Sequence, residues 1–316
     1  MVTNAELRDI RAQAVPRGVA SATGIFAMRA ENSEIWDQDG RRFIDFAGGI
    51  AVLNVGHRHP KVMLAVSEQL NRYTHTAFQV VPYEPYVRLA ARLNALAPID
   101  GPAKTIFFTT GAEATENAVK IARAATGSSA IIAFGGGFHG RTLLASALTG
   151  KVNPYKRGLG PFPSEIYHVP FPADNSGVTV EDSLRAIENI FSYDIEPERV
   201  AAFIIEPVQG EGGFNPAPPA LLEGLAKLRE RYGILLIADE VQTGFARTGR
   251  MFGIEHSGVM PDLIAVAKSL GGGFPLSGVI GRAEIMDVIE PGGLGGTYAG
   301  SPVALAAASA VLDVIE

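Results

Sequence analysis

The chain of 316 residues contains no cysteine, which excludes disulfides, catalytic thiolates and iron–sulfur clusters. Positive charge is in the minority, and the net charge of −6 argues against nucleic acid or an anionic membrane as the main partner. No apolar run is long enough to cross a membrane, and the N-terminus lacks the apolar core of a secretory signal. We therefore expect a cytoplasmic protein with small-molecule partners.

What the sequence does contain is an alternation of helix-length segments with short apolar runs. The predicted helices are 60–72, 83–97, 112–126, 181–192, 217–232 and 301–316, and the runs are KTIFFTTG, SAIIAFGGG, AAFIIEP, GILLIADE and DLIAVAK. This pattern predicts an α/β fold with a mostly parallel central sheet. We place a small N-terminal element at residues 1–55, with a hairpin over 33–46, and a large α/β domain at 56–316.

Three successive apolar runs end in ionisable residues, namely Glu206, Asp239 and Lys268. They are 33 and 29 residues apart, and each gap is long enough for a crossover to the next parallel strand. Each strand could simply end in solvent, where charge is favourable. Three such ends in a row instead predict a ligand site at the carboxyl edge of one sheet.

Lys268 is the most informative of the three, because it ends a buried run and enters a triple glycine, AKSLGGG. A lysine that loses hydration favours its neutral, nucleophilic form, which suits Schiff-base chemistry. A cofactor that combines an aldehyde with a ring nitrogen also needs an acid to keep that nitrogen protonated. Lys268 and Asp239 together predict pyridoxal phosphate, whereas the adjacent Glu240 is expected to turn toward a structural partner.

The phosphate of such a cofactor needs a cradle, and FFTTGAEATENAVKIARAA supplies a strand, then Gly111, then a helix that begins near Ala112. Residues 135–140, GGGFHG, also match the dinucleotide fingerprint, but the following segment is a poor helix and no ribose-binding acid follows. A metal site at His57 and His59 lacks further ligands. We therefore expect no metal, and we expect Phe138 to stack on a cofactor ring.

Seven ordered motifs resemble one family. They are FAGGIAVLNVGHRHP, TTGAEATENAVKIARAAT, FHGRTLLASALTGKVNPY, IIEPVQGEGG, ADEVQTGFARTG, AKSLGGGFPLSGVIG and GGLGGTYAGSP, and they resemble the class III (subgroup II) aminotransferases from about residue 10 to the end of the chain. The resemblance implies fold type I of the pyridoxal-phosphate-dependent transferases. It also implies transfer of the amino group of 4-aminobutyrate, or a related ω-amino acid, to 2-oxoglutarate by a ping-pong mechanism that gives succinate semialdehyde and glutamate.

The resemblance further implies a role for each site residue. Lys268 forms the covalent bond to the cofactor and moves the proton between the substrate carbon and the cofactor carbon. Asp239 pairs with the pyridine nitrogen. The remaining expected cofactor contacts are Gly111, Ala112, Phe138, Val241, Gln242 and, from a neighbouring subunit, Thr297. The expected substrate contacts are Ile50, Arg141, Glu206 and Glu211, with Glu211 pairing with an arginine further along the chain. A homodimer or a dimer of dimers is implied.

Two departures from the family accompany these matches. Ala112 stands where the family often has serine, and the family continues for about another hundred residues, which complete the small domain. Because the helical pattern runs to Glu316 without a cap, we expect the chain to be cut short. The alternatives that stay open are an acetylornithine- or 5-aminovalerate-type transaminase, a nicotinamide oxidoreductase, and a catalytically silent chain that binds cofactor.

Overall fold

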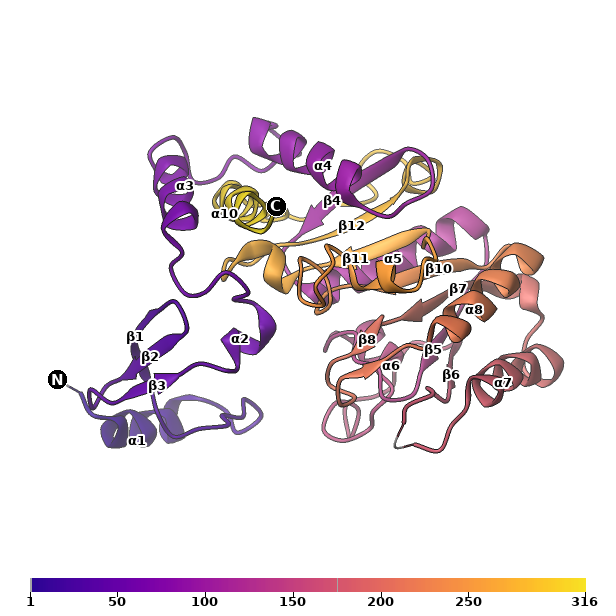
Figure 1. Ribbon diagram of the computed structural model, residues 1–316, viewed down its shortest axis with the longest axis horizontal. Helices are drawn as coiled ribbons and strands as arrows, with labels where there is room; N and C mark the ends of the chain where they lie inside the picture. Colours follow the sequence, from indigo (N-terminus) through magenta and orange to yellow (C-terminus); the bar gives the residue numbers. More distant parts are fainter. Residues whose placement is uncertain (1, 175) are drawn as a thin grey trace.

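The computed structural model describes residues 2–174 and 176–316, and its centre is a seven-stranded sheet (Figure 1). The order across the sheet is β4 (Ala103–Phe108), β12 (Ser277–Arg282), β11 (Leu263–Val266), β10 (Leu235–Asp239), β7 (Val200–Ile205), β5 (Ala130–Phe134) and β6 (Ile166–Val169). Strand β12 runs antiparallel to both of its neighbours, and the other pairs are parallel. The prediction of a mostly parallel sheet is confirmed.

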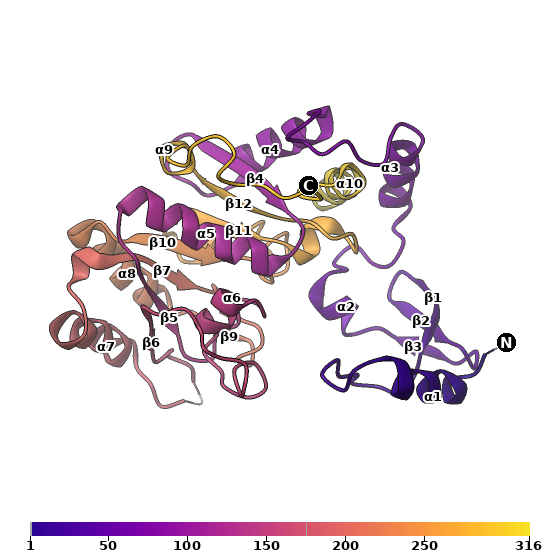
Figure 2. The same cartoon turned by 180° about the vertical axis from the view of Figure 1, so that it is seen from behind.

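Helices cover both faces of this sheet, because its central strands are apolar on both sides. One face carries α5 (Gly111–Thr126), α6 (Leu143–Leu148) and α9 (Ala283–Met286), and α5 crosses in front of the sheet in Figure 2. The other face carries α4 (Glu84–Leu96), α7 (Val180–Tyr193), α8 (Pro219–Tyr232) and α10 (Pro302–Ile315). The result is the three-layered architecture expected of fold type I.

Helix α5 matters most for the site, and its start is encoded locally. The Thr110 hydroxyl accepts a hydrogen bond from the backbone N–H of Glu113, and the Glu113 carboxylate accepts one from the backbone N–H of Thr110. This capping box fixes where the first turn begins. The helix ends at Gly127, which takes the left-handed conformation that glycine adopts without strain.

The N-terminal elements lie apart from the large sheet (Figure 1). They comprise α1 (Asn4–Ala14), β1 (Ala27–Glu31), β2 (Glu34–Asp37), β3 (Arg42–Ile44) and α2 (Gly48–Ala51). Strands β2 and β3 pair antiparallel, so the predicted hairpin is confirmed. The domain boundary at residue 55 stays a prediction.

Helix α3 (Pro60–Leu70) packs against α10. The remaining elements are short. They are η1 (Pro197–Arg199), β8 (Val208–Gln209), β9 (Asn215–Pro216), η2 (Gly253–His256) and η3 (Lys268–Gly271). Among the described residues, no helix combines the length and apolar character needed to cross a membrane.

Candidate active site

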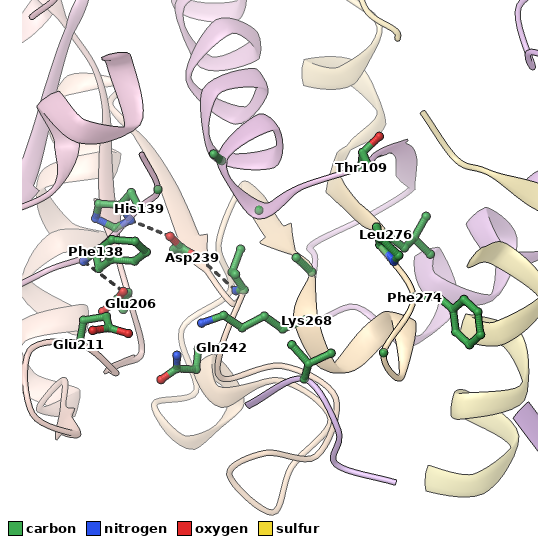
Figure 3. A pocket seen from close by; sticks show the side chains of 18 residues that line it. Thr109, Phe138, His139, Glu206, Glu211, Asp239, Gln242, Lys268, Phe274 and Leu276 are labelled. Carbon is green, nitrogen blue, oxygen red and sulfur yellow. Dashed lines mark hydrogen bonds and ion pairs between the residues drawn. The ribbon is translucent and has the colours of Figure 1, made fainter. Parts of the chain in front are cut away.

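The three ionisable strand ends meet at one edge of the sheet. Strands β7, β10 and β11 are consecutive parallel neighbours, so Glu206, Asp239 and Lys268 follow them on the same side. All three line a cavity of about 360 Å³, which Figure 3 shows from close by. This volume is in the range of cofactor and substrate pockets. The expectation that these residues come together is confirmed.

Lys268 enters the cavity from a strained turn directly after β11. It is the first residue of η3 and has a φ of +46°, a left-handed conformation that costs a non-glycine residue about 1 kcal/mol or more. Burial lowers the pKa of Lys268, and the charges of Asp239 and Glu206 oppose this effect without cancelling it. The turn thus presents an amine that loses its proton more readily than an exposed lysine.

Asp239 shares the cavity wall with a histidine that the sequence analysis did not select. The Nδ1 atom of His139 lies 2.6 Å from Oδ2 of Asp239, and both side chains are buried. The other oxygen of Asp239 accepts the backbone N–H of Val241 at 3.1 Å. Burial by itself lowers the pKa of His139, but the hydrogen bond and charge of Asp239, together with the charge of Glu206, raise it above its ordinary value.

Glu206 completes a buried cluster with these two groups. Its Oε1 accepts the backbone N–H of Phe138 at 3.2 Å, whereas its buried Oε2 has no hydrogen-bond partner among the described residues. Burial, with a further contribution from Asp239, raises the pKa of Glu206 to about 8, although His139 and Lys268 act in the opposite direction. The cavity wall thus holds a carboxyl group that keeps its proton to a higher pH than an exposed glutamate does.

The same three groups could in principle hold a metal ion. Ligand atoms of His139, Glu206 and Asp239 lie within 4.8 Å of one another. The hydrogen bond between His139 Nδ1 and Asp239 Oδ2 already occupies one nitrogen and one oxygen of this set. The cluster is therefore better suited to holding protons than to forming a coordination shell.

Glu240 is directed away from the cavity, as the sequence analysis expected. Its carboxylate accepts the backbone N–H groups of Gly253 at 2.9 Å and Ile254 at 2.7 Å, and it is also hydrogen-bonded by the Thr243 hydroxyl. Burial raises the pKa of Glu240 to about 7 despite these donors. Its role in the described structure is to fix the segment that begins η2.

A cradle for an anion lies where β4 passes into α5. Gly111 and Ala112 open the helix and line the cavity, so the N–H groups of its first turn face that space. A Cβ atom on Gly111 would stand 3.0 Å from Cγ1 of Val241, and one on Gly140 would stand 2.7 Å from Cβ of Ala112. The two glycines therefore let three backbone segments approach one another around the cradle.

Three of the remaining predicted cofactor contacts line the same cavity as this cradle and Lys268. Phe138, Val241 and Gln242 line the cavity (Figure 3). The side chain of Gln242 lies so close to Gly210 that a Cβ there would fall 1.8 Å from Oε1.

Apart from the buried Glu206, the predicted substrate contacts are exposed. Glu211 lines both this cavity and a neighbouring one of about 730 Å³, which Ile50 also lines. Arg141 is exposed and does not line either cavity; its guanidinium lies 5.0 Å from the ring centroid of Tyr155. Thr297 is also exposed and lies outside both cavities of its own chain.

The two competing motifs have structural explanations. The glycines of GGGFHG lead from β5 toward α6, a helix of six residues, which is short for a dinucleotide-binding crossover. Nε2 of His57 lies 2.8 Å from Oδ2 of Asp45. Among the described residues, no metal-ligating cluster includes His57 or His59.

Comparison with known proteins distinguishes the aminotransferase interpretation from the dinucleotide-binding and metal-site interpretations. The family described as "Aminotransferase class-III" matches residues 14–316. The chain belongs to the class III aminotransferases. It is 58% identical over 314 residues to the 5-aminovalerate aminotransferase DavT of Pseudomonas putida, with 99% of this chain and 74% of that protein covered. It is 55% identical over 316 residues to the 4-aminobutyrate aminotransferase GabT of Escherichia coli, with 100% and 74% covered.

Solved structures of aminotransferases resemble this one closely. The ornithine aminotransferase of Toxoplasma gondii matches with a TM-score of 0.88 at 31% identity, with 100% of this aminotransferase and 72% of that chain covered. An amine transaminase from an uncultivated Pseudomonas species, in its PLP-bound form, matches with a TM-score of 0.87 at 30% identity, with 95% and 73% covered.

The cavity of this aminotransferase fits pyridoxal phosphate on its own residues. It offers a partly buried lysine, a buried carboxylate on the neighbouring strand and a helix N-terminus for an anion. Glu206, whose Oε2 has no hydrogen-bond partner within the described part of the chain, lines the same space. These groups match the amine, the ring-nitrogen partner and the phosphate cradle that the cofactor requires.

Proposed function

We propose that this aminotransferase moves the amino group of 4-aminobutyrate, or a related ω-amino acid, to 2-oxoglutarate with pyridoxal 5′-phosphate as its cofactor. The products are succinate semialdehyde and glutamate. The observation that carries the proposal is the pairing of Lys268 and Asp239 at the ends of neighbouring parallel strands, facing one cavity. When bound, the cofactor supplies an aldehyde that accepts the amino group and a ring that takes up electrons.

Lys268 and Asp239 carry the chemistry in this proposal. Lys268, whose pKa is lowered, takes a proton at Nζ from the substrate carbon that bears the amino group and would pass it to the aldehyde carbon of the cofactor; the second half-reaction runs the same transfer in reverse. Asp239 holds a proton on the cofactor's ring nitrogen. Its buried hydrogen bond with His139 fixes the carboxylate in one orientation, which supports that role.

The cofactor is held by the groups around the cavity. Gly111 and Ala112 donate backbone N–H groups to the phosphate, and the absence of a serine hydroxyl at position 112 leaves these donors in place. Phe138 and Val241 enclose the ring from its two faces. Gln242, packed against the backbone at position 210, donates to the ring oxygen.

Substrate recognition falls to the residues at the mouth. Arg141 binds the far carboxylate of the ω-amino acid through its planar guanidinium, and Ile50 supplies apolar surface beside it. Glu206, protonated at neutral pH, adds a neutral hydrogen-bonding group at the cavity wall. Glu211 adjusts the site between a donor with one carboxylate and an acceptor with two.

A second donor, 5-aminovalerate, is supported by the 58% identity to the Pseudomonas putida enzyme. The two donors differ by one methylene, which a hydrophobic pocket distinguishes by only about 1–3 kcal/mol. Acetylornithine carries its reacting amine on the same kind of chain and is a third candidate. The second cavity, of about 730 Å³, leaves room for the longer donors.

We also propose that the active unit is a homodimer or a dimer of dimers. Thr297 is exposed and lies outside its own chain's cavity, so it is available to reach the phosphate of a neighbouring subunit. Light scattering of the purified protein, with and without cofactor, measures the assembly. A cytoplasmic location and a small-domain segment at residues 1–55 stay predictions of the sequence.

The test of the proposed function is direct. The purified chain, loaded with pyridoxal phosphate, should transfer nitrogen from 4-aminobutyrate or 5-aminovalerate to 2-oxoglutarate with ping-pong kinetics, which mass spectrometry of both products detects. Lys268→Ala should abolish transfer, whereas Lys227→Ala, at an exposed position on α8, should not. Tight cofactor binding without transfer from any of the three donors would instead support the silent-chain alternative.

A further inference from the structure

Tyr155 contacts three residues of the proposed site, one through its hydroxyl and two through its ring. Its hydroxyl donates a hydrogen bond to Oε2 of Glu211 at 3.3 Å. Its ring centroid lies 4.9 Å from that of Phe138, and the guanidinium carbon of Arg141 lies 5.0 Å from the same ring. One partly buried tyrosine thus connects the ring-binding residue, the carboxylate-binding arginine and the acidic residue of the proposed site.

Arg141 and Glu211 carry opposite charges and contact different parts of this tyrosine, the ring and the hydroxyl. Within residues 2–174 and 176–316, neither of them forms an ion pair. Burial and then the charge of Glu211 raise the pKa of the Tyr155 hydroxyl, while the charge of Arg141 acts in the opposite direction. Both charges therefore act on Tyr155, yet they do not neutralise each other.

We propose that Tyr155 is a positioning residue that holds Arg141 on its ring face and Glu211 on its hydroxyl, and so prevents these two residues from pairing. This inference rests on the proposed role of Arg141 in binding the substrate carboxylate. A guanidinium that lies on an aromatic face keeps its N–H groups available at its edge. The same guanidinium in an ion pair with Glu211 has its N–H groups occupied.

The two contacts of Tyr155 can be separated by mutation. Tyr155→Phe keeps the ring, and with it the contacts to Arg141 and Phe138, but releases Glu211. The freed carboxylate then competes with the substrate for Arg141. Because an exposed ion pair is worth up to about 1 kcal/mol, the competition should weaken carboxylate binding by roughly threefold to fivefold.

The experiment compares four forms of the cofactor-loaded chain. They are the wild type, Tyr155→Phe, Tyr155→Phe combined with Glu211→Gln, and the control Tyr193→Phe, which changes an exposed tyrosine at the end of α7. KM and kcat are measured for 4-aminobutyrate and for butylamine, which lacks a carboxylate. Calorimetry then measures the binding of pentanoate, an unreactive monocarboxylate.

Tyr155→Phe should raise KM for 4-aminobutyrate and the Kd for pentanoate by roughly threefold to fivefold and leave kcat and butylamine unaffected. Glu211→Gln in the same chain should restore the Kd for pentanoate, because an amide cannot form the competing ion pair. Equal losses for both amines, or no rescue by Glu211→Gln, would overturn the proposal and leave Tyr155 a structural residue.

The pentanoate measurement separates this inference from the proposed function. If the wild type does not transfer nitrogen from 4-aminobutyrate, the proposed function fails. The role of Tyr155 is then still supported if pentanoate binds the four forms with the predicted pattern. If the wild type is active and pentanoate binds the four forms equally, the proposed function stands and the role of Tyr155 is wrong.

Discussion

Replacing Glu206 by glutamine should remove a pH dependence of stability that this buried carboxyl group imposes on the chain. The pKa of Glu206 is raised from 4.5 to about 8, so the folded state holds the proton more tightly than the unfolded chain does. Its stabilising contribution is therefore complete below pH 4.5 and is lost as the pH rises through about 8. Each pH unit within that window removes up to about 1.4 kcal/mol from the free energy of unfolding.

Across the whole window the loss is at most on the order of 5 kcal/mol, a large part of the stability of an ordinary domain. His139 also lowers the free energy of unfolding as the pH rises above the pKa of its imidazole in the unfolded chain, because its pKa in the folded state is raised as well. Lys268 acts oppositely, because its lowered pKa makes the folded state more stable as its proton leaves. The charge of Glu206 raises the pKa of both groups, so the difference between the wild type and Glu206→Gln measures Glu206 together with its coupling to His139 and Lys268.

Urea unfolding of the cofactor-free chain at about pH 5 and about pH 8.5 measures this difference. The amide resembles the protonated carboxyl group, so Glu206→Gln should be close to the wild type at the lower pH and more stable by several kcal/mol at the higher one. Glu188→Gln, an exposed change on α7, is the matched control. Parallel pH profiles for the wild type and Glu206→Gln would show that the carboxyl group is ionised at neutral pH and would refute the reasoning.

Three further outcomes test the site. Borohydride reduction of the yellow holoenzyme should bleach it and leave a pyridoxyl group on Lys268, and peptide mapping that finds the group on Lys120 or Lys151 would contradict the assignment. Asp239→Asn should lower turnover by orders of magnitude, since a preorganised charge partner is worth roughly 3 kcal/mol or more, while spectroscopic titration still finds cofactor bound. Arg141→Lys should raise KM for 4-aminobutyrate and not for butylamine; equal effects would make Arg141 a structural residue.

The sheet could be predicted because its strands carry strong local signals. The runs that became β5, β7 and β10 are continuously apolar and are bounded by glycine or acid, which is typical of strands buried on both faces. Strand β12 was not predicted. Its sequence, SGVIGR, has two glycines among six residues, and only the pairing with β4 and β11 makes it a strand.

The site was predictable to the extent that it depends on strand ends. Glu206, Asp239 and Lys268 could be brought together because parallel neighbours end at one edge. His139 and Tyr155 were not selected, because they lie in irregular segments whose paths no periodicity describes. Phe138, the neighbour of His139, was selected as a stacking residue. The presence of a histidine in the same glycine-rich turn was the sequence signal that could have led to His139.

The roles of Arg141, Ile50 and Thr297 depend on the family resemblance more than on spacing. Each of them is exposed, and none lines the cavity that contains Lys268. Local sequence cannot say whether an exposed residue serves its own site, a neighbouring subunit or the solvent. Their assignment therefore needs the substrate and assembly measurements described above.

The adjacent acids at the end of β10 show how one strand serves both chemistry and folding. Successive side chains of a strand point to opposite faces, so Asp239 and Glu240 cannot both enter the cavity. Asp239 contacts His139 beside Lys268, whereas Glu240 accepts the backbone N–H groups of Gly253 and Ile254. A buried strand ends in two acids because one of them faces the cofactor site and the other fixes the loop behind it.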